Sequence, residues 1–210
     1  DPLRYMGNPA FSGLLLRHTT EELRELITKS QEMYPKIWPG IKWSERKMQW
    51  TAPSGAKLWL SYLDKDQDVT RYQGLAFSWI GFDELTQWGT PFSWNYMRSR
   101  LRTADPELPL SMRATTNPGG RGHGWVKKMF IDPAPAGKSF IATEIETGEQ
   151  LKYPAGHAKA GKPLFKRRFI PARLKDNPYL AQQGDYEAML LSLPEQQRRQ
   201  LLDGDWDIKE

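Results

Sequence analysis

The sequence lacks cysteine, long apolar runs and clustered histidine. With no cysteine among 210 residues, disulfide bonds and thiolate metal sites are excluded. No apolar stretch approaches the roughly 20 residues that span a bilayer, and the mean hydropathy is −0.69. The three histidines are far apart and lack the HExxH spacing of a zinc site. The first residues carry none of the features of a signal peptide. These absences predict a cytoplasmic protein with no membrane segment.

Charge is distributed unevenly along the chain. The net charge is +5, and residues 111–175 carry 13 Lys/Arg against 4 Asp/Glu, whereas residues 176–210 carry 3 against 8. A basic segment of this kind attracts a polyanion such as DNA through counterion release. A solvated basic face has the same composition, so both interpretations stay open here.

Hydrophobic periodicity and turn residues predict alternating strands and helices. The predicted strands are 11–17, 42–51, 57–63, 75–83, 110–116, 139–145 and 168–174, and the predicted helices are 19–35, 93–102, 124–130 and 178–202 with a break at Pro194. The segments 42–51 and 57–63 flank a Pro-Ser-Gly turn and should form a hairpin. This alternation predicts a three-layer α/β domain with a mostly parallel sheet.

The most informative segment is Leu75–Glu84, an apolar run that ends in two carboxylates, Asp83 and Glu84. Such a run suits a buried parallel strand, and ligand sites lie beyond the carboxyl ends of these strands. There Asp83 can hold Mg²⁺ through its water shell while Glu84 activates a water that attacks a nucleotide phosphate, the Walker B arrangement. Alternatively, Asp83 caps a helix and Glu84 lies in its first turn.

A second strand also ends in polar residues. Thr115, Thr116 and Asn117 follow the strand after Asp83 at a distance of about 32 residues, enough for one crossover helix. If the two strands are neighbours, these side chains open onto the same edge and can hydrogen-bond a water or a phosphate. Otherwise Asn117-Pro-Gly simply turns the chain.

These residues resemble a known family, the large subunit of the terminase that packages DNA in tailed bacteriophages and prophages. The resemblance covers almost the whole chain and rests on five segments: Tyr72–Thr86, similar to the Walker B region; Ala114–Gly120, similar to the coupling motif; and His123–Lys127, Asp176–Leu180 and Leu202–Asp207. Each segment is weak alone, whereas their order and spacing together are specific.

The resemblance implies a RecA-like ATPase fold of the additional-strand catalytic-glutamate type, incomplete at its N-terminal side and followed by a small helical and stranded appendage. Residues 1–135 would be the partial ATPase core, and residues 136–210 an associated subdomain ending at the linker to an absent nuclease domain. ATP and Mg²⁺ would be the cofactors, with Asp83 holding the metal through water and Glu84 as general base. Thr115, Thr116 and Asn117 would couple hydrolysis to motion.

The resemblance also implies partners and a setting. The partners would be double-stranded DNA, the small terminase subunit, the portal and procapsid, and further copies of the chain, all in the host cytoplasm. Family members often place an arginine that acts on a neighbouring subunit's site where this chain has Gln73. Arg71, two residues away, could substitute, or it could be an ordinary surface arginine.

One family feature is missing from the sequence, because no Gly-x-x-x-x-Gly-Lys-[Ser/Thr] loop is present. Without it, these 210 residues should bind ATP poorly and hydrolyse it negligibly by themselves. Loss of the strand before that loop should leave an unpaired sheet edge or require another chain. The alternative functions are a non-catalytic module that binds DNA or the small terminase subunit, and another ATPase such as a helicase.

Overall fold

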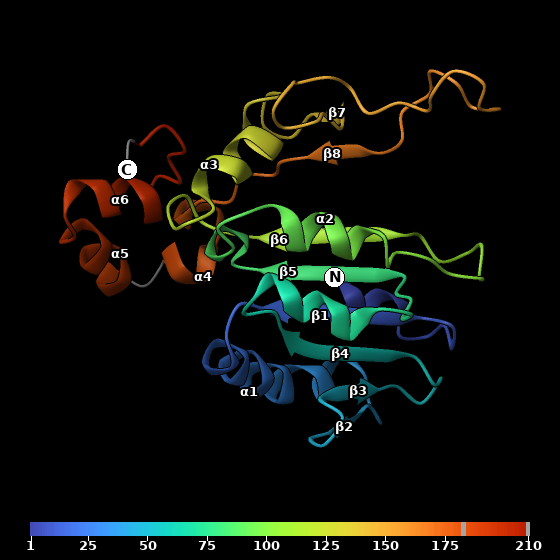
Figure 1. The fold of residues 1–210 in the computed structure, drawn as a ribbon. Helices are drawn as coiled ribbons and strands as arrows, with labels where there is room; N and C mark the ends of the chain where they lie inside the picture. The colour runs from blue at the N-terminus through green and yellow to red at the C-terminus, as the bar shows by residue number, and fades with distance from the viewer. Residues whose placement is uncertain (182–183, 209–210) are drawn as a thin grey trace. The chain divides into compact units, whose positions relative to one another are not determined.

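The computed structural model describes residues 1–181 and 184–208, which form two compact units, Asp1–Thr116 and Asn117–Glu210 (Figure 1). The division follows β6 directly. The predicted extent of the ATPase core, residues 1–135, concerns function and stays a prediction. In the described part of the chain, no helix is both long and apolar enough to cross a membrane.

The first unit is built on a six-stranded sheet in the order β2-β3-β4-β1-β5-β6. Its strands are β1 (Ser12–Arg17), β2 (Lys42–Ser44), β3 (Gln49–Thr51), β4 (Lys57–Tyr62), β5 (Trp79–Asp83) and β6 (Ser111–Thr115). Its helices are η1 (Pro2–Tyr5), α1 (Thr20–Ile37), η2 (Asp66–Tyr72), η3 (Leu85–Gln87) and α2 (Phe92–Arg98). The four strands β4, β1, β5 and β6 are parallel, whereas β2 and β3 are antiparallel at one edge. The predicted α/β class with a mostly parallel sheet is confirmed.

Helix α1 begins where the sequence predicts. The Thr19 hydroxyl accepts from the backbone N–H of Glu22 at 3.3 Å, and the Glu22 carboxylate accepts from the N–H of Thr19 at 3.2 Å, which closes a capping box. The predicted end at Pro35 is wrong, because the helix continues to Ile37. The missing N–H of Pro35 removes one helical hydrogen bond within the last turn, where the loss is tolerated.

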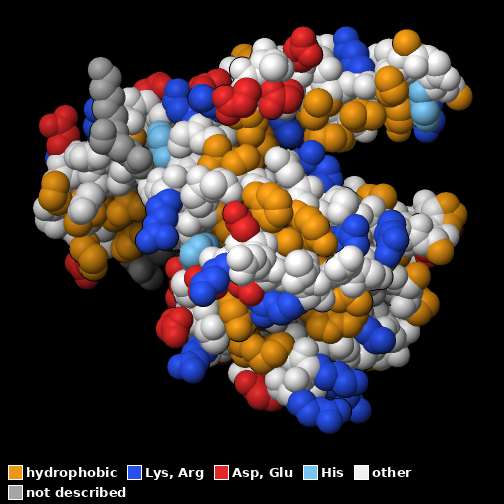
Figure 2. Space-filling model, viewed as in Figure 1, with side chains coloured by type: hydrophobic (Ala, Val, Ile, Leu, Met, Phe, Trp, Pro, Cys, Tyr) orange, Lys and Arg blue, Asp and Glu red, His pale blue; other side chains and the backbone are white. Residues whose placement is uncertain are grey.

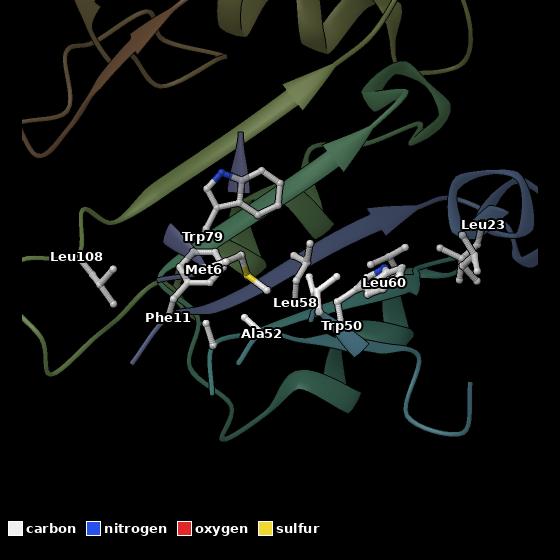
Figure 3. Close-up of a cluster of buried hydrophobic side chains, with 12 residues drawn as sticks. Met6, Phe11, Leu23, Trp50, Ala52, Leu58, Leu60, Trp79 and Leu108 are labelled. Carbon is white, nitrogen blue, oxygen red and sulfur yellow. The ribbon is translucent and has the colours of Figure 1, made fainter. Parts of the chain in front are cut away.

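The two faces of the sheet carry separate layers. On one face, Trp79, Leu58 and Leu60 pack with Leu23 and Ile27 of α1 (Figure 3). On the other face, Phe82 of β5 packs against Trp88 and against Trp94 of α2, with ring centroids 5.0 and 5.3 Å apart. Because side chains alternate along a strand, odd-numbered residues of β5 face α1 and even-numbered residues face α2.

Two predicted strands of the first unit differ in detail from the structure, and the one predicted over 75–83 begins only at Trp79. The hairpin between β3 and β4 is confirmed, with Trp50 opposite Leu58. The single strand predicted over 42–51 is wrong, because a turn at 45–48 divides it into β2 and β3. Met48 has a φ of 50° in this turn, a left-handed conformation that a continuous strand excludes.

The second unit contains a two-stranded sheet and short helices. Its elements are α3 (His123–Val126), the π-helical turn η4 (Lys127–Ile131), β7 (Ser139–Ile141), β8 (Lys166–Arg168), η5 (Leu174–Asp176), α4 (Pro178–Ala181), α5 (Gly184–Leu191) and α6 (Glu195–Leu201). The break at Pro194 is confirmed by the start of α6 at Glu195. The part of the predicted tail helix at 182–183 lies outside the described residues.

Three predictions for the second unit are corrected. The predicted helix 124–130 changes to π-helical turns after Val126. The predicted strand 139–145 forms a strand, β7, only over its first three residues. The predicted strand 168–174 is wrong, because β8 is Lys166–Arg168, set by its pairing with β7. Pro171 cannot donate a ladder hydrogen bond, so a strand there lacked a partner.

Gly81 offers a test of the packing that fixes β5. A Cβ built on Gly81 would lie 2.2 Å from Cη2 of Trp79 and 2.9 Å from Cδ1 of Leu15. We expect Gly81→Ala to destabilise the fold by about 1–3 kcal/mol, because the rigid indole must move. Chemical denaturation measures the change. The matched control is Gly124→Ala, whose Cβ would meet nothing within 4 Å. Equal stabilities of the two variants would contradict the packing described.

Candidate functional site

The carboxyl ends of β1, β5 and β6 meet at one edge of the sheet. β5 pairs in parallel with both neighbours, with Leu16 opposite Phe82 and Asp83 opposite Thr115. The predicted pairing of the Asp83 strand with the Thr115 strand is therefore confirmed. Extending the register by one residue places Arg17 of β1 beside Asp83, on the face that Trp79 and Gly81 share.

Asp83 is held from both sides by these neighbours. The Thr115 hydroxyl donates to its Oδ1 atom, and Nη2 of Arg17 lies 2.6 Å from its Oδ2 atom. The side chains of Arg17 and Asp83 are 17% and 20% exposed, so the ion pair is shielded from water on most sides. The interpretation of Asp83 as a helix cap is wrong, because its oxygens accept from Thr115 and Arg17 instead.

Glu84 adopts a backbone conformation that non-glycine residues avoid. Its φ and ψ are 60° and 56°, in the left-handed region. That conformation costs about 1–2 kcal/mol for an L-residue, and residues held in it cluster at functional sites. Glu84 ends the strand abruptly, and its carbonyl accepts from the N–H of Gln87 at 2.9 Å to start η3. Because η3 begins at Leu85, Glu84 precedes its first turn, and the first-turn interpretation is also wrong.

The two adjacent carboxyl groups differ in electrostatic surroundings. Partial burial raises the pKa of Glu84 above the ordinary value of 4.5, and the negative charge of Asp83 raises that pKa further. Arg17 lowers it and Glu22 raises it, as smaller contributions. A carboxylate with a raised pKa accepts a proton more readily near neutral pH, which suits a general base.

Thr116 joins the end of β6 to the loop that follows the acids. Its hydroxyl accepts from the N–H of Thr86 at 3.1 Å and donates to the Thr86 hydroxyl at 2.9 Å. The structure therefore brings Thr115 and Thr116 to the acid-bearing loop, as predicted. Asn117 follows directly as the first residue of the second unit, and its role stays a prediction.

Arg71 lies on η2 and is engaged within its own unit. Its Nη2 atom donates to the carbonyl of Tyr62 at 3.1 Å and lies 3.3 Å from the Asp68 carboxylate. Its guanidinium also sits 4.7 Å from the centroid of the Tyr62 ring. A role on a neighbouring subunit would require these contacts to break, and that role stays a prediction.

Arg17 is the site residue that sequence reasoning missed. It follows Leu14, Leu15 and Leu16, and an arginine beside a buried apolar strand indicates a charged partner, because arginine is rarely buried unless it is paired. The partner could not be identified because β1 and β5 are distant in sequence.

The oxygen donors at this edge suit a hard divalent cation. Asp83 supplies carboxylate oxygens and Thr115 a hydroxyl oxygen, which are ligands that Mg²⁺ accepts. Across the residues the structure describes, no group of three or more His, Cys, Asp or Glu is placed to hold a metal ion. These oxygens fit a cation that keeps most of its water shell, the usual manner for Mg²⁺.

The motifs behind the family resemblance also come together in the second unit. The imidazole of His123 stacks on Trp206 with centroids 5.3 Å apart, and its Nδ1 accepts from the N–H of Gly119 at 2.9 Å. Lys127 forms ion pairs with Asp132 at 2.9 Å and Asp207 at 3.0 Å. The segments around His123 and Trp206 are thus one packed cluster.

Comparison of the fold with solved structures gives a class to which it is similar. The large terminase of a thermophilic bacteriophage, solved in complex with ADP, superposes with a TM-score of 0.60 at 14% identity. That match covers 92% of this chain and 40% of the terminase, so the chain spans less than half of that protein. The ATPase domain of the Thermus phage P74-26 large terminase gives a TM-score of 0.49 at 10% identity, covering 98% of this chain and 80% of that domain.

No protein-family model and no curated protein sequence matches the chain. The similarity therefore lies in the fold: an α/β unit with a mostly parallel sheet, of the kind found in phage large terminases. This is the fold that the sequence resemblance implied.

The raised pKa of Glu84 predicts that Glu84→Gln stabilises the fold, and that this stabilisation depends on pH. Above pH 4.5, the pKa of Glu84 in the unfolded chain, folding opposes ionisation of this carboxyl group, which destabilises the native state. Below pH 4.5 the group is protonated in both the folded and the unfolded chain, and this destabilisation vanishes. We expect the variant to be more stable than the parent at pH 7 and equal to it at low pH. Thermal melts across pH measure this. The exposed Glu107→Gln is the control, and an equal gain there would contradict the explanation.

The Arg17–Asp83 ion pair predicts strong coupling between the two positions. We expect Arg17→Gln and Asp83→Asn each to destabilise by about 1–3 kcal/mol, because each leaves its shielded partner unsatisfied. The double variant should lose less than the sum of the single variants, with a coupling energy of about 1 kcal/mol or more. Urea denaturation of the four proteins measures the cycle. Additive losses would show that the ion pair contributes nothing.

Proposed function

We propose that this chain is the ATP-hydrolysing portion of a DNA-packaging motor, coupling Mg-ATP hydrolysis to the movement of double-stranded DNA. The observation that carries the proposal is the pairing of β5 with β6, which sets Asp83 and Glu84 beside Thr115 and Thr116. The similarity of the fold to a terminase solved with ADP supports a nucleotide as the ligand.

The roles of the acids follow from their surroundings. Asp83, held in place between Arg17 and Thr115, would hold Mg²⁺ through water. The ion, when bound, neutralises the phosphate oxygens and aligns them. Glu84, with a raised pKa, would take the proton from the water that attacks the terminal phosphate. Its strained backbone fixes the direction of the side chain at the end of β5.

Thr116 would couple hydrolysis to motion. Its hydroxyl is hydrogen-bonded to both the backbone and the side chain of Thr86, three residues after Asp83. A shift of the loop at Glu84 therefore pulls on the end of β6, from which Asn117 leads into the second unit. Thr115 would respond to the same event because it donates to Asp83.

The phosphates of a bound nucleotide would need further hydrogen-bond donors. The sequence has no glycine-rich loop with lysine, so a segment beside the site or another copy would have to supply the backbone amides that cradle them. Assembly with further copies of the chain, the small terminase subunit and the portal in the host cytoplasm would follow from a role in packaging.

Glu84→Gln tests the proposal. In the complete gene product, we expect DNA-stimulated ATP hydrolysis to fall by about 10²–10⁴-fold, because the general base is gone. Nucleotide binding should stay within a few-fold, since the glutamine keeps the shape of the side chain. Asp83→Asn should instead weaken the Mg²⁺ dependence of binding. Turnover and equilibrium binding of a fluorescent ATP analogue measure the two effects.

Glu107→Gln, which removes an exposed acid away from the sheet edge, serves as the control and should leave turnover unchanged. Full activity of Glu84→Gln would overturn the assignment of the general base. Binding of DNA with no nucleotide binding or turnover in the parent would favour the alternative, a non-catalytic DNA-binding module.

A further inference from the structure

The second unit carries an extended arm, which we define as residues 138–168. It begins with β7, ends with β8, and is closed by the bridges Thr143–Gln150 and Lys152–Pro163. Backbone hydrogen bonds link its segments: Leu151 N–H to the Ala142 carbonyl at 2.8 Å, and Leu164 N–H to the Leu151 carbonyl at 2.9 Å. The arm is therefore a hydrogen-bonded structure with defined faces.

One face of the arm carries a basic stripe, which we define as Lys162, Lys166 and Arg168. Exposure alternates from residue 162 to residue 168: the even-numbered side chains are exposed, and the odd-numbered ones are partly or fully buried. Arg167 is only 8% exposed and donates to the Thr143 carbonyl at 2.9 Å, which anchors the alternation. The three cations thus lie on the exposed side of this segment, with Lys166 and Arg168 in β8 and Lys162 on the chain just before it.

The charges of the stripe are not neutralised within the described part of the chain. Among the described residues, none of the three cations forms an ion pair. From Gln150 to Lys175 the sequence has eight Lys/Arg and no Asp or Glu. The three acids of the arm, Glu144, Glu146 and Glu149, gather at its other turn, where Glu144 accepts from the N–H of Thr147 at 2.6 Å. Figure 2 shows basic and apolar side chains together at the end of the arm.

The tip of the arm is a folded aromatic cluster. Tyr153 stacks on His157 with ring centroids 4.5 Å apart, and Nζ of Lys159 lies 5.8 Å from the centroid of the Tyr153 ring. The N–H of Tyr153 donates to the Lys162 carbonyl at 2.9 Å, so the two residues are paired and share the face of the stripe. Because His157 already covers Tyr153, the ring is a poor platform for an unstacked base.

We propose that the basic stripe binds the phosphate backbone of double-stranded DNA without reading its sequence. Three exposed cations that form no ion pair, spaced along one side of a hydrogen-bonded arm, suit a regular array of phosphates, which a duplex presents at fixed spacing. The occupied aromatic ring disfavours a single strand, whose binding depends on base stacking. The inference rests on the proposed packaging function and deepens it by assigning a DNA-contacting surface. It depends on no nucleotide chemistry.

The test compares two triple variants with the same change in charge. The stripe variant is Lys162→Gln, Lys166→Gln, Arg168→Gln; the control is Lys36→Gln, Arg46→Gln, Lys47→Gln, three exposed cations of the first unit. Binding to a short duplex, with no nucleotide present, is followed by fluorescence anisotropy over a series of salt concentrations. All six side chains are exposed, and circular dichroism checks that both variants fold.

We expect the stripe variant to bind about tenfold or more weakly and to reduce the slope of log K against log salt by about 2.7, or about 0.9 for each phosphate that is no longer neutralised. The control should keep the parent slope. A variant with Lys162→Arg and Lys166→Arg, which keeps all three charges, should bind DNA as the parent does. Equal losses in both triple variants would overturn the proposal, since net charge alone would explain them. Tighter binding of a single strand of the same sequence would overturn the choice of a duplex.

Lack of ATP turnover in the complete gene product would leave this result unaffected, because binding is measured without nucleotide. Conversely, loss of the stripe should leave the basal, DNA-independent turnover of that gene product unchanged. Failure of the surface assignment and failure of the proposed ATPase function are therefore distinguishable.

Discussion

The site depends on the register of three parallel strands. Arg17, Asp83 and Thr115 are neighbours only because β1, β5 and β6 pair in one alignment, and a slip of β5 by one residue would move Asp83 to the opposite face. The indole of Trp79 lies over Gly81 and next to Leu15, which leaves no room for another side chain. Core packing well below the edge thus decides which carboxylate meets Arg17.

This register also gives the two adjacent acids different surroundings. Asp83 faces a cation and a hydroxyl, whereas Glu84, one residue later in a left-handed conformation, has neither as a close partner in the described contacts. Desolvation and the charge of Asp83 then raise the pKa of Glu84. The two adjacent carboxyl groups thus have different partners, and the raised pKa of Glu84 suits a base.

Much of this arrangement follows from local sequence. The apolar run before Asp83 and the spacing to Thr115 predicted two neighbouring parallel strands, because burial on both faces leaves a recognisable pattern. Arg17 could not be predicted, because the insertion of β1 between β4 and β5 depends on tertiary packing that the order along the chain does not give. The prediction of β8 was wrong for a similar reason, because the register of this strand is set by its pairing with β7 and not by its own residues.

The edge position of β6 determines what the site still needs. Within the described residues, β6 pairs with β5 alone, and Arg113, Ala114 and Thr115 are exposed. An edge strand presents unpaired N–H and C=O groups along its free side, a template for one more strand. The acids and hydroxyls lie at the carboxyl ends of β5 and β6, and a bound triphosphate would also require backbone amide donors. A parallel strand added to β6 would bring its own carboxyl end, and the loop that follows it, beside Thr115 and one strand away from Asp83.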